Sequence, residues 1–268
     1  MSATIKIFEA NYADLLNGNV SITITDTVAT NNGQDIVDFM RNRDLNSAWA
    51  TTDSTDAAGT QIDISLGDGQ TVSEVLLLGH NLKSFTVSTF NGATYDVQYT
   101  TTTETEDVTE ITFAEVETTA VRIIVNGTQV ADDDKFVRRI LVTKLFGQFN
   151  GFPKIQSPTN STNKKQTKML SGKISLTEGV GSFQCKLSID NFYDVADLEL
   201  VQNIYLNRNG VEVWLCGGDE DQFTFAAKGY RRLDIFRMRP VDEYKPEWQK
   251  GIYVLGTKQT LDLVEVVR

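Results

Sequence analysis

Residues 61–92 read QIDISLGDGQTVSEVLLLGHNLKSFTVSTFNG, and this stretch decides the fold class. Ile62, Ile64 and Leu66 alternate with polar residues, and this period of two predicts a strand with one buried face. Residues 75–78 form a continuous apolar run, which is typical of a strand covered on both faces. The stretch therefore predicts strands rather than helices.

Turn residues separate these runs. Residues 67–69 read GDG and residues 79–81 read GHN, and both segments are expected to be turns. After the second turn, Phe85 and Val87 resume the alternation. No helix fits between the breaks, so the stretch is expected to form the middle of an antiparallel β-sandwich.

Further short strands are expected on both sides of this stretch. About eight of them lie between Ile36 and Leu145, at the spacing of a sandwich or barrel. Residues 36–40 favour a short helical turn. Residues 5–8 and 20–25 are expected to pair as two leader strands across the turn Asn-Gly-Asn at 17–19.

The order of these segments predicts three parts in a mostly β chain. Residues 1–150 are expected to form a jelly-roll β-sandwich with the leader strands. Residues 151–170, which are polar and contain two prolines, are expected to be a linker or an exposed arm. Residues 171–268 are expected to form a smaller β-rich assembly domain with one short helix capped by Asp194. A β-hairpin is expected around the Asn-Arg-Asn-Gly turn at 207–210.

The charge of the chain argues against several partners. With 268 residues, a formal net charge of -11 and a pI of about 4.6, it lacks the cationic surface that phosphate backbones require. No nucleic acid partner is therefore expected, and no apolar run is long enough for membrane insertion. No secretory signal is visible, and Cys185 and Cys216 are expected to be buried thiols of a protein made in a reducing cytoplasm, with a disulfide between them as the lesser alternative.

The sequence offers no catalytic set. Its single histidine, His80, excludes multi-histidine metal sites, and no carboxylate pair is placed for acid–base chemistry. We expect no enzymatic activity, no cofactor and no metal. Residues 132–134, three aspartates, are candidates for calcium, but a solvated loop is the stronger interpretation. His80 is expected in a structural turn, where Asn81 ties the backbone.

Binding residues are a second possibility. Tyr95 and Trp49 are candidates for stacking on a sugar ring, although a position in the sandwich core is the favoured interpretation for both. Tyr95, with the loop at Asn91, forms the candidate carbohydrate site. The candidate interface residues are cationic, and the alternatives for them are cross-strand charge pairing and a solvated linker. They are Arg231, Arg232, Arg237, Arg239, Lys164 and Lys165.

The first half of the chain resembles the discoidin, or galactose-binding-like, β-sandwich. The segments that carry the resemblance are LNSAWAT, IDISLGDGQTVSEVLLLGHNL, FNGATYDV, TTAVRIIVNG and RRILVTKL. The run LLLGHNL is similar to versions of this domain in structural proteins of tailed bacteriophages. The region from VWLCGGDEDQF through GYRRLDIFR to LDLVEV also looks like a phage tail-associated protein.

This resemblance implies a non-enzymatic structural component of a phage virion, in the tail or baseplate. Its partners would be other virion proteins and copies of itself, and it would be assembled in the bacterial cytoplasm. The alternative is a carbohydrate-binding module that recognises a cell-surface glycan. The chain departs from the family in lacking its cysteine pair and its loop of exposed aromatics, and its sugar-binding residues cannot be matched one by one.

Overall fold

The structure is a computed structural model, and it describes part of the chain. The described residues are 5–15, 18–26, 33–41, 47–52, 55–57, 59–149, 154–161, 164–168, 174–178, 182–189, 195–207, 210–214, 235–240, 247–250 and 255–265. They belong to two compact units. The sandwich unit comprises residues 11–145, and the second unit comprises residues 1–10 and 146–268.

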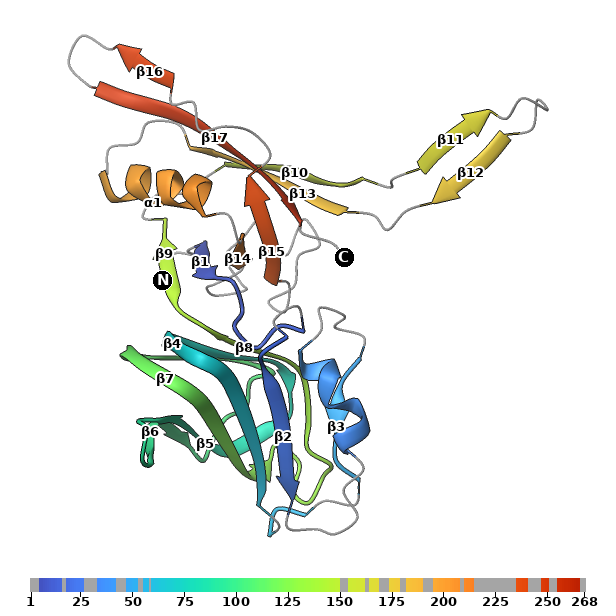
Figure 1. The fold of residues 1–268 in the computed structure, drawn as a ribbon, viewed down its shortest axis with the longest axis vertical. Helices are drawn as coiled ribbons and strands as arrows, with labels where there is room; N and C mark the ends of the chain where they lie inside the picture. Colours follow the sequence, from blue (N-terminus) through green and yellow to red (C-terminus); the bar gives the residue numbers. More distant parts are fainter. Residues whose placement is uncertain are drawn as a thin grey trace. The chain divides into compact units, whose positions relative to one another are not determined.

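The sandwich unit is built from antiparallel strands, which Figure 1 shows in blue to green. Its elements are β2 (Ser21–Asp26), the 3-10 helix η1 (Gly33–Met40), β3 (Trp49–Ala50), β4 (Thr60–His80), β5 (Leu82–Phe90), β6 (Tyr95–Thr101), β7 (Val108–Thr128) and β8 (Phe136–Thr143). The strands follow the order β3-β8-β4-β7-β5-β6, and β2 pairs with β4.

Two long strands, β4 and β7, contribute to both layers of the sandwich. The first half of β4 pairs with β2 and with the second half of β7, while its second half pairs with β8 and with the first half of β7. The β4–β7 pairing is irregular between Ser65 and Gln70, where Gly67 has a φ of +74°. A backbone conformation that only glycine adopts readily thus changes the course of β4 without ending it.

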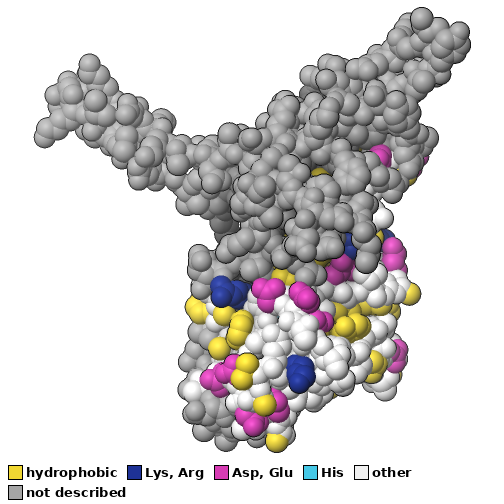
Figure 2. Space-filling model, turned by 180° about the vertical axis from the view of Figure 1, so that it is seen from behind, with side chains coloured by type: hydrophobic (Ala, Val, Ile, Leu, Met, Phe, Trp, Pro, Cys, Tyr) yellow, Lys and Arg dark blue, Asp and Glu magenta, His cyan; other side chains and the backbone are white. Residues whose placement is uncertain are grey.

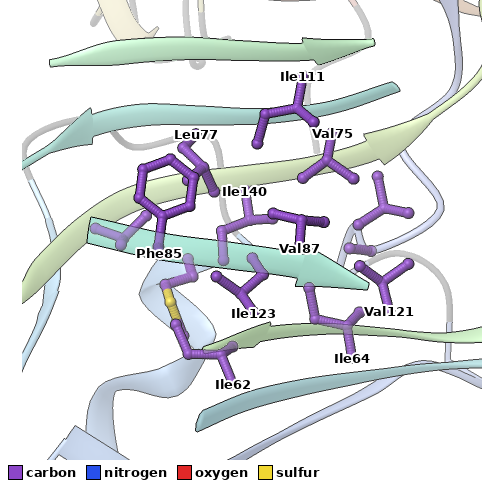
Figure 3. Packing of buried hydrophobic residues seen from close by; sticks show 14 of the residues in the cluster. Ile62, Ile64, Val75, Leu77, Phe85, Val87, Ile111, Val121, Ile123 and Ile140 are labelled. Carbon is purple, nitrogen blue, oxygen red and sulfur yellow. The ribbon is translucent and has the colours of Figure 1, made fainter. Parts of the chain in front are cut away.

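The core lies between the two layers. Figure 3 shows the side chains of Ile62 and Ile64, from the first half of β4, in one cluster with Val75 and Leu77 from its second half. Phe85 and Val87 of β5 and Ile123 of β7 belong to the same cluster. The alternation that predicted buried faces is confirmed at these positions, and Trp49 is fully buried there as well.

The second unit is also mostly β. Its elements are β1 (Lys6–Glu9), β9 (Leu145–Gln148, which starts at the last residue of the sandwich unit), β10 (Lys154–Ser161), β11 (Lys164–Lys168), β12 (Ile174–Glu178), β13 (Ser182–Ile189), α1 (Val195–Leu206), β14 (Val211–Trp214), β15 (Ile235–Pro240), β16 (Glu247–Lys250) and β17 (Leu255–Glu265). β11 and β12 form a two-stranded sheet, and the other strands form one sheet in the order β10-β13-β17-β15-β14-β1-β9, with β16 beside β17.

The predicted fold class is confirmed, since the described residues are mostly strands and include one α-helix. The 3-10 helix η1 confirms the predicted helical turn. The prediction of a turn at 67–69 is wrong, because β4 runs from Thr60 to His80 as one strand. The segments expected as two strands around Ile111 and Val121 are likewise one strand, β7.

The prediction that residues 5–8 and 20–25 pair as leader strands is also wrong. β1 pairs with β14, with Ile7 opposite Val213, whereas β2 pairs with β4 in the sandwich unit. Ile7 and Phe8 are fully buried, so both faces of β1 pack in the second unit. The sandwich unit therefore starts at Asn11 rather than at the first residue, and it ends at Leu145.

Residues 154–161 and 164–168, expected in a linker or arm, form β10 and β11, which pair with β13 and β12. One expectation about the second half needs correction. The turn at 207–210 joins α1 to β14 and does not close a β-hairpin. Leu200, Val201 and Ile204 are buried on one face of α1, which explains why this segment is helical. Asp194, the expected cap, lies outside the described residues.

Candidate functional site

The outer face of the sandwich unit carries a row of polar side chains that cross-strand pairing brings together. Asp63 alternates with the core residues Ile62 and Ile64 on β4, and Arg122 alternates with core residues on β7. Asp63 lies directly opposite Arg122 in the β4–β7 register. Both side chains therefore point away from the core and toward each other.

Asp63 and Arg122 form an ion pair. Arg122 Nε lies 2.6 Å from Asp63 Oδ1, and the side chains of Arg122 and Asp63 are 28% and 25% exposed, respectively. Gln61, two residues before Asp63 on the same face of β4, donates from Nε2 to Asp63 Oδ2 at 2.6 Å. The hydrogen bond with Asp63 raises the pKa of Arg122 against the opposing effect of burial. The guanidinium is thus held in place as a permanent cation beside a carboxylate.

Tyr95 completes this row from the neighbouring hairpin. The Arg122 guanidinium carbon lies 3.8 Å from the centre of the Tyr95 ring, and the Phe90 ring lies 5.2 Å from it, tilted by 49°. Tyr95 is half-buried at the start of β6 and is not part of the core cluster. We call Gln61, Asp63, Arg122 and Tyr95 the outer-face strip. The interpretation of Tyr95 as a core residue is therefore wrong.

Asn91, the other candidate for carbohydrate binding, holds the β5–β6 turn. Its Oδ1 accepts hydrogen bonds from the backbone N–H groups of Ala93 and Thr94, at 2.9 and 2.8 Å. Its Nδ2 donates to Thr94 Oγ1 and to Asp96 Oδ2, at 3.1 and 2.9 Å. Every hydrogen-bonding position of the amide is thus used inside the turn. The structure brings Asn91 and Tyr95 onto one hairpin but gives Asn91 a local structural role.

His80 is buried at the end of β4. The N–H of Leu82 donates to its Nδ1 at 3.1 Å, so Nε2 carries the proton and faces Thr109 Oγ1 at 2.9 Å. Burial lowers the pKa of His80 to about 4, although Glu104 and Asp107 oppose the shift. The imidazole is therefore neutral at neutral pH and occupied on both nitrogens, which confirms the structural interpretation of this segment.

Asn81 joins its own turn to the start of β8 and to the residue two positions before it, as expected of a residue that ties the backbone. Its Nδ2 donates to the carbonyl of Asp134 at 2.7 Å, and its Oδ1 accepts from the N–H of Phe136 at 3.0 Å. Asp132 has a φ of +58° and accepts the N–H of Asp56 at 3.0 Å. The acidic loop at 132–134 thus serves to join loops, and the described residues contain no cluster of three or more potential metal ligands.

The candidate interface residues are only partly covered by the structure. Arg237 is half-buried on β15 opposite Glu212, and Arg239 is exposed on the same strand. Lys164 and Lys165 lie on β11, with Lys164 opposite Glu178 of β12. Arg231, Arg232 and Cys216 are outside the described residues, as is the side chain of Cys185. The predicted interface stays a prediction.

The surface of the sandwich unit is mixed in character. Figure 2 shows acidic, basic and hydrophobic side chains interspersed on the visible face of its described residues, without a continuous basic surface. Large exposed hydrophobic side chains are scattered among the described residues, with Val97 63% and Val130 66% exposed. No described helix is long and apolar enough to span a bilayer.

The chain matches no protein-family model and no curated protein sequence. Solved structures are similar to about half of it. One is chitosan-binding module 1 of a chitosanase/glucanase from Paenibacillus sp. IK-5, with 22% identity over 50% of this chain and 98% of that module, at a TM-score of 0.40. Another is the family 32 CBM from C. perfringens NanJ, in complex with galactose. It has 13% identity over 52% of this chain and 99% of that module, at a TM-score of 0.41.

A third similar structure is a GH29 fucosidase from Ruminococcus gnavus, in complex with fucose. It has 18% identity over 51% of this chain and 27% of the fucosidase, at a TM-score of 0.41. These three neighbours are two carbohydrate-binding modules and a glycosidase. At such identities and TM-scores the likeness does not extend to function.

Proposed function

We propose that residues 11–145 form a non-catalytic module that binds carbohydrate on the outer-face strip. The observation that carries the proposal is the Asp63–Arg122 pair, which lies partly exposed against the ring of Tyr95. An aromatic side chain beside a few fixed polar groups is the usual composition of a small-molecule site. Sugars present hydroxyl groups that both donate and accept, and this strip offers both kinds of partner.

The strip is held by rigid elements. Gln61 and Asp63 lie on β4, Arg122 on β7 and Tyr95 on β6, and three direct contacts link the four side chains in a row. Because their rotamers are fixed before any ligand arrives, binding costs little side-chain entropy. A sugar is therefore recognised without loop closure.

The geometry also changes how Tyr95 contributes. The Arg122 guanidinium covers one face of the Tyr95 ring, so a sugar cannot stack on that face while Arg122 stays in place. The principal contacts are then hydrogen bonds to Arg122 and Asp63, and Tyr95 supports the guanidinium. This assigns Arg122 and Asp63, rather than Asn91, to direct contact with the ligand.

The test is binding of the full-length protein to a printed array of oligosaccharides and polysaccharides. Arg122→Ala is compared with Lys83→Ala, which also removes one positive charge from an exposed position. Lys83 lies five residues along β5 from Ser88, the residue opposite Arg122, which is about 16 Å at the rise of a strand. Binding lost in Arg122→Ala and kept in Lys83→Ala supports the proposal, and absence of glycan binding by the wild type would overturn it.

The virion role is a second proposal, supported by the resemblance of LLLGHNL and of the closing region to phage structural proteins. It would place the chain in a multimer with copies of itself or other virion proteins. Native mass measurement of the purified protein, alone and mixed with a candidate neighbour, tests it. A chain that stays monomeric in every mixture would count against the virion role without affecting the glycan proposal.

A further inference from the structure

The charges of the outer-face strip balance locally. Its one cation, Arg122, and its one carboxylate, Asp63, lie 2.6 Å apart, and Gln61 and Tyr95 are neutral. An anionic ligand would have to compete with Asp63 for the guanidinium and would approach a chain with a formal net charge of -11. Both effects disfavour an acidic ligand.

The same pair offers a donor next to an acceptor. Arg122 donates from Nε to Asp63 Oδ1, its guanidinium carbon lies 3.8 Å from the centre of the Tyr95 ring, and a side-chain hydrogen bond with Tyr95 contributes to its raised pKa. The terminal nitrogens of its planar fork carry four N–H bonds, which is more than the contact with Tyr95 uses. Each carboxylate oxygen of Asp63 accepts a hydrogen bond, Oδ1 from Arg122 and Oδ2 from Gln61, and the two oxygens together have about four lone-pair positions. A donor and an acceptor are thus held side by side at one point of the sheet.

Two neighbouring hydroxyl groups of a sugar ring match this arrangement. One hydroxyl oxygen accepts from a terminal N–H of Arg122, and the adjacent hydroxyl donates to a carboxylate oxygen of Asp63. Both bonds are charge-assisted, and neither requires the ion pair to separate. A carboxylate or sulfate group has no hydroxyl hydrogen to offer Asp63, so it would make only the first contact and would be repelled by Asp63.

We propose that the Asp63–Arg122 pair selects uncharged glycans through two neighbouring hydroxyl groups and discriminates against acidic glycans. This inference rests on the proposed carbohydrate-binding function and specifies the class of its ligand. Asp63 is then a specificity-determining residue, because it makes the site neutral as well as accepting one hydrogen bond.

The experiment uses the full-length protein with two sets of immobilised polysaccharides. The neutral set is galactan and mannan, which present neighbouring hydroxyl groups, and the acidic set is polygalacturonate and hyaluronan. Wild-type protein is expected to bind at least one neutral polysaccharide at least tenfold more tightly than either acidic one, with little dependence on salt. Mild periodate oxidation, which cleaves neighbouring hydroxyl pairs, is expected to abolish binding to a glycan that presents them.

Asp63→Asn removes the negative charge of the strip while keeping the shape of the side chain, so the strip keeps only the positive charge of Arg122. It is expected to lose at least tenfold in affinity for the neutral polysaccharide and to gain salt-sensitive binding to polygalacturonate, because Arg122 then lacks its carboxylate. Lys83→Ala is expected to behave as wild type. Thermal unfolding of each variant checks that it is folded, and Gln61→Ala, which leaves the ion pair intact, provides a milder second variant with reduced affinity.

The outcomes separate the two proposals. Salt-sensitive binding of wild type to the acidic set, or neutral binding that is unchanged in folded Asp63→Asn, would overturn the discrimination by Asp63 and leave a glycan-binding function standing. Binding to neither set and to no glycan on the array would overturn the proposed function itself.

Discussion

Arg122 and Asp63 lie directly opposite each other on β7 and β4, and Arg122 Nε is 2.6 Å from Asp63 Oδ1. The two residues are 59 positions apart in the sequence. Their contact exists only because the sandwich sets this register, and the face on which they meet is the one that the core does not use.

This ion pair is expected to stabilise the fold only modestly. Both side chains are about a quarter exposed, so solvent screens their attraction, and the coupling is expected to be about 0.5–1 kcal/mol. A double-mutant cycle of Asp63→Ala and Arg122→Ala in urea unfolding measures it. A coupling several times larger would show that the pair is mainly a structural element, and binding defects in these variants would then need a different interpretation.

His80 is expected to lower the stability of the fold at mildly acidic pH. Burial lowers its pKa to about 4, so the folded state favours the neutral imidazole, whereas the unfolded chain takes up a proton near pH 6.5. The stabilisation is therefore complete above about pH 6.5 and is lost as the pH falls toward about 4, at a total cost of about 3 kcal/mol. Urea unfolding at a series of pH values measures this loss.

The matched variant for that experiment is His80→Gln. It is expected to be less stable at neutral pH, because Leu82 and Thr109 lose their imidazole partner, but to show a flatter pH dependence between pH 6.5 and 4. An unchanged slope in this variant would assign the pH dependence to other groups.

Asp56 is expected to affect the pH dependence of stability at lower pH than His80 does. Burial alone would raise its pKa, but hydrogen bonds from the N–H and hydroxyl of Thr128, each 3.0 Å long, contribute to a net lowering. The stabilisation from Asp56 is thus present above its ordinary pKa of about 3.8 and disappears as the pH falls below it. Asp56→Asn should lower stability at neutral pH and reduce the loss below that pH; an unaltered acid limb would argue against this assignment.

Gly67 is expected to be required for the course of β4. It has a φ of +74°, and a Cβ atom there would lie 2.8 Å from the backbone oxygen of Asn19. Gly67→Ala should destabilise the protein by at least about 1–2 kcal/mol, from the left-handed conformation alone. Gly18→Ala is the control, because a Cβ at Gly18 meets no atom within 4 Å. Equal midpoints of thermal unfolding for the two variants would contradict this role.

Asn91 is expected to matter for the turn and only indirectly for a ligand. Asn91→Ala removes four hydrogen bonds of the β5–β6 turn and should cost about 1–2 kcal/mol of stability. Glycan affinity, measured at a temperature where the variant is fully folded, should change less than in Arg122→Ala. A larger loss of affinity in Asn91→Ala than in Arg122→Ala would return Asn91 to the binding site.

Local sequence patterns predicted the fold class well, because a strand with one buried face carries apolar side chains at every second position. Ile62, Ile64, Phe85 and Val87 were all expected to be buried, and all are in the core. The patterns failed where tertiary pairing overrides local signals. The glycines around position 67 bend a strand instead of ending it, and β1 pairs with β14, far along the chain.

The candidate site was less predictable than the fold. The sequence points to Tyr95 as a possible binding residue, but its partner Arg122 follows from the register of β7 and β5, which no local pattern specifies. A usable signal was present, since Asp63 and Arg122 are oppositely charged residues at outward positions of two strands. Recognising them as a pair required knowing that these strands are neighbours.

The most direct test of the account is NMR titration of the full-length protein with the neutral polysaccharide that it binds best on the array. Side-chain N–H signals of Arg122 and Gln61 are observable and report on the outer-face strip itself. We predict that the Arg122 Nε signal shifts in a saturable manner with added glycan, together with the backbone signals of residues 61–63 and 122. Saturable shifts confined to other parts of the chain, with the Arg122 signal unmoved, would contradict the assignment of the strip as the binding site.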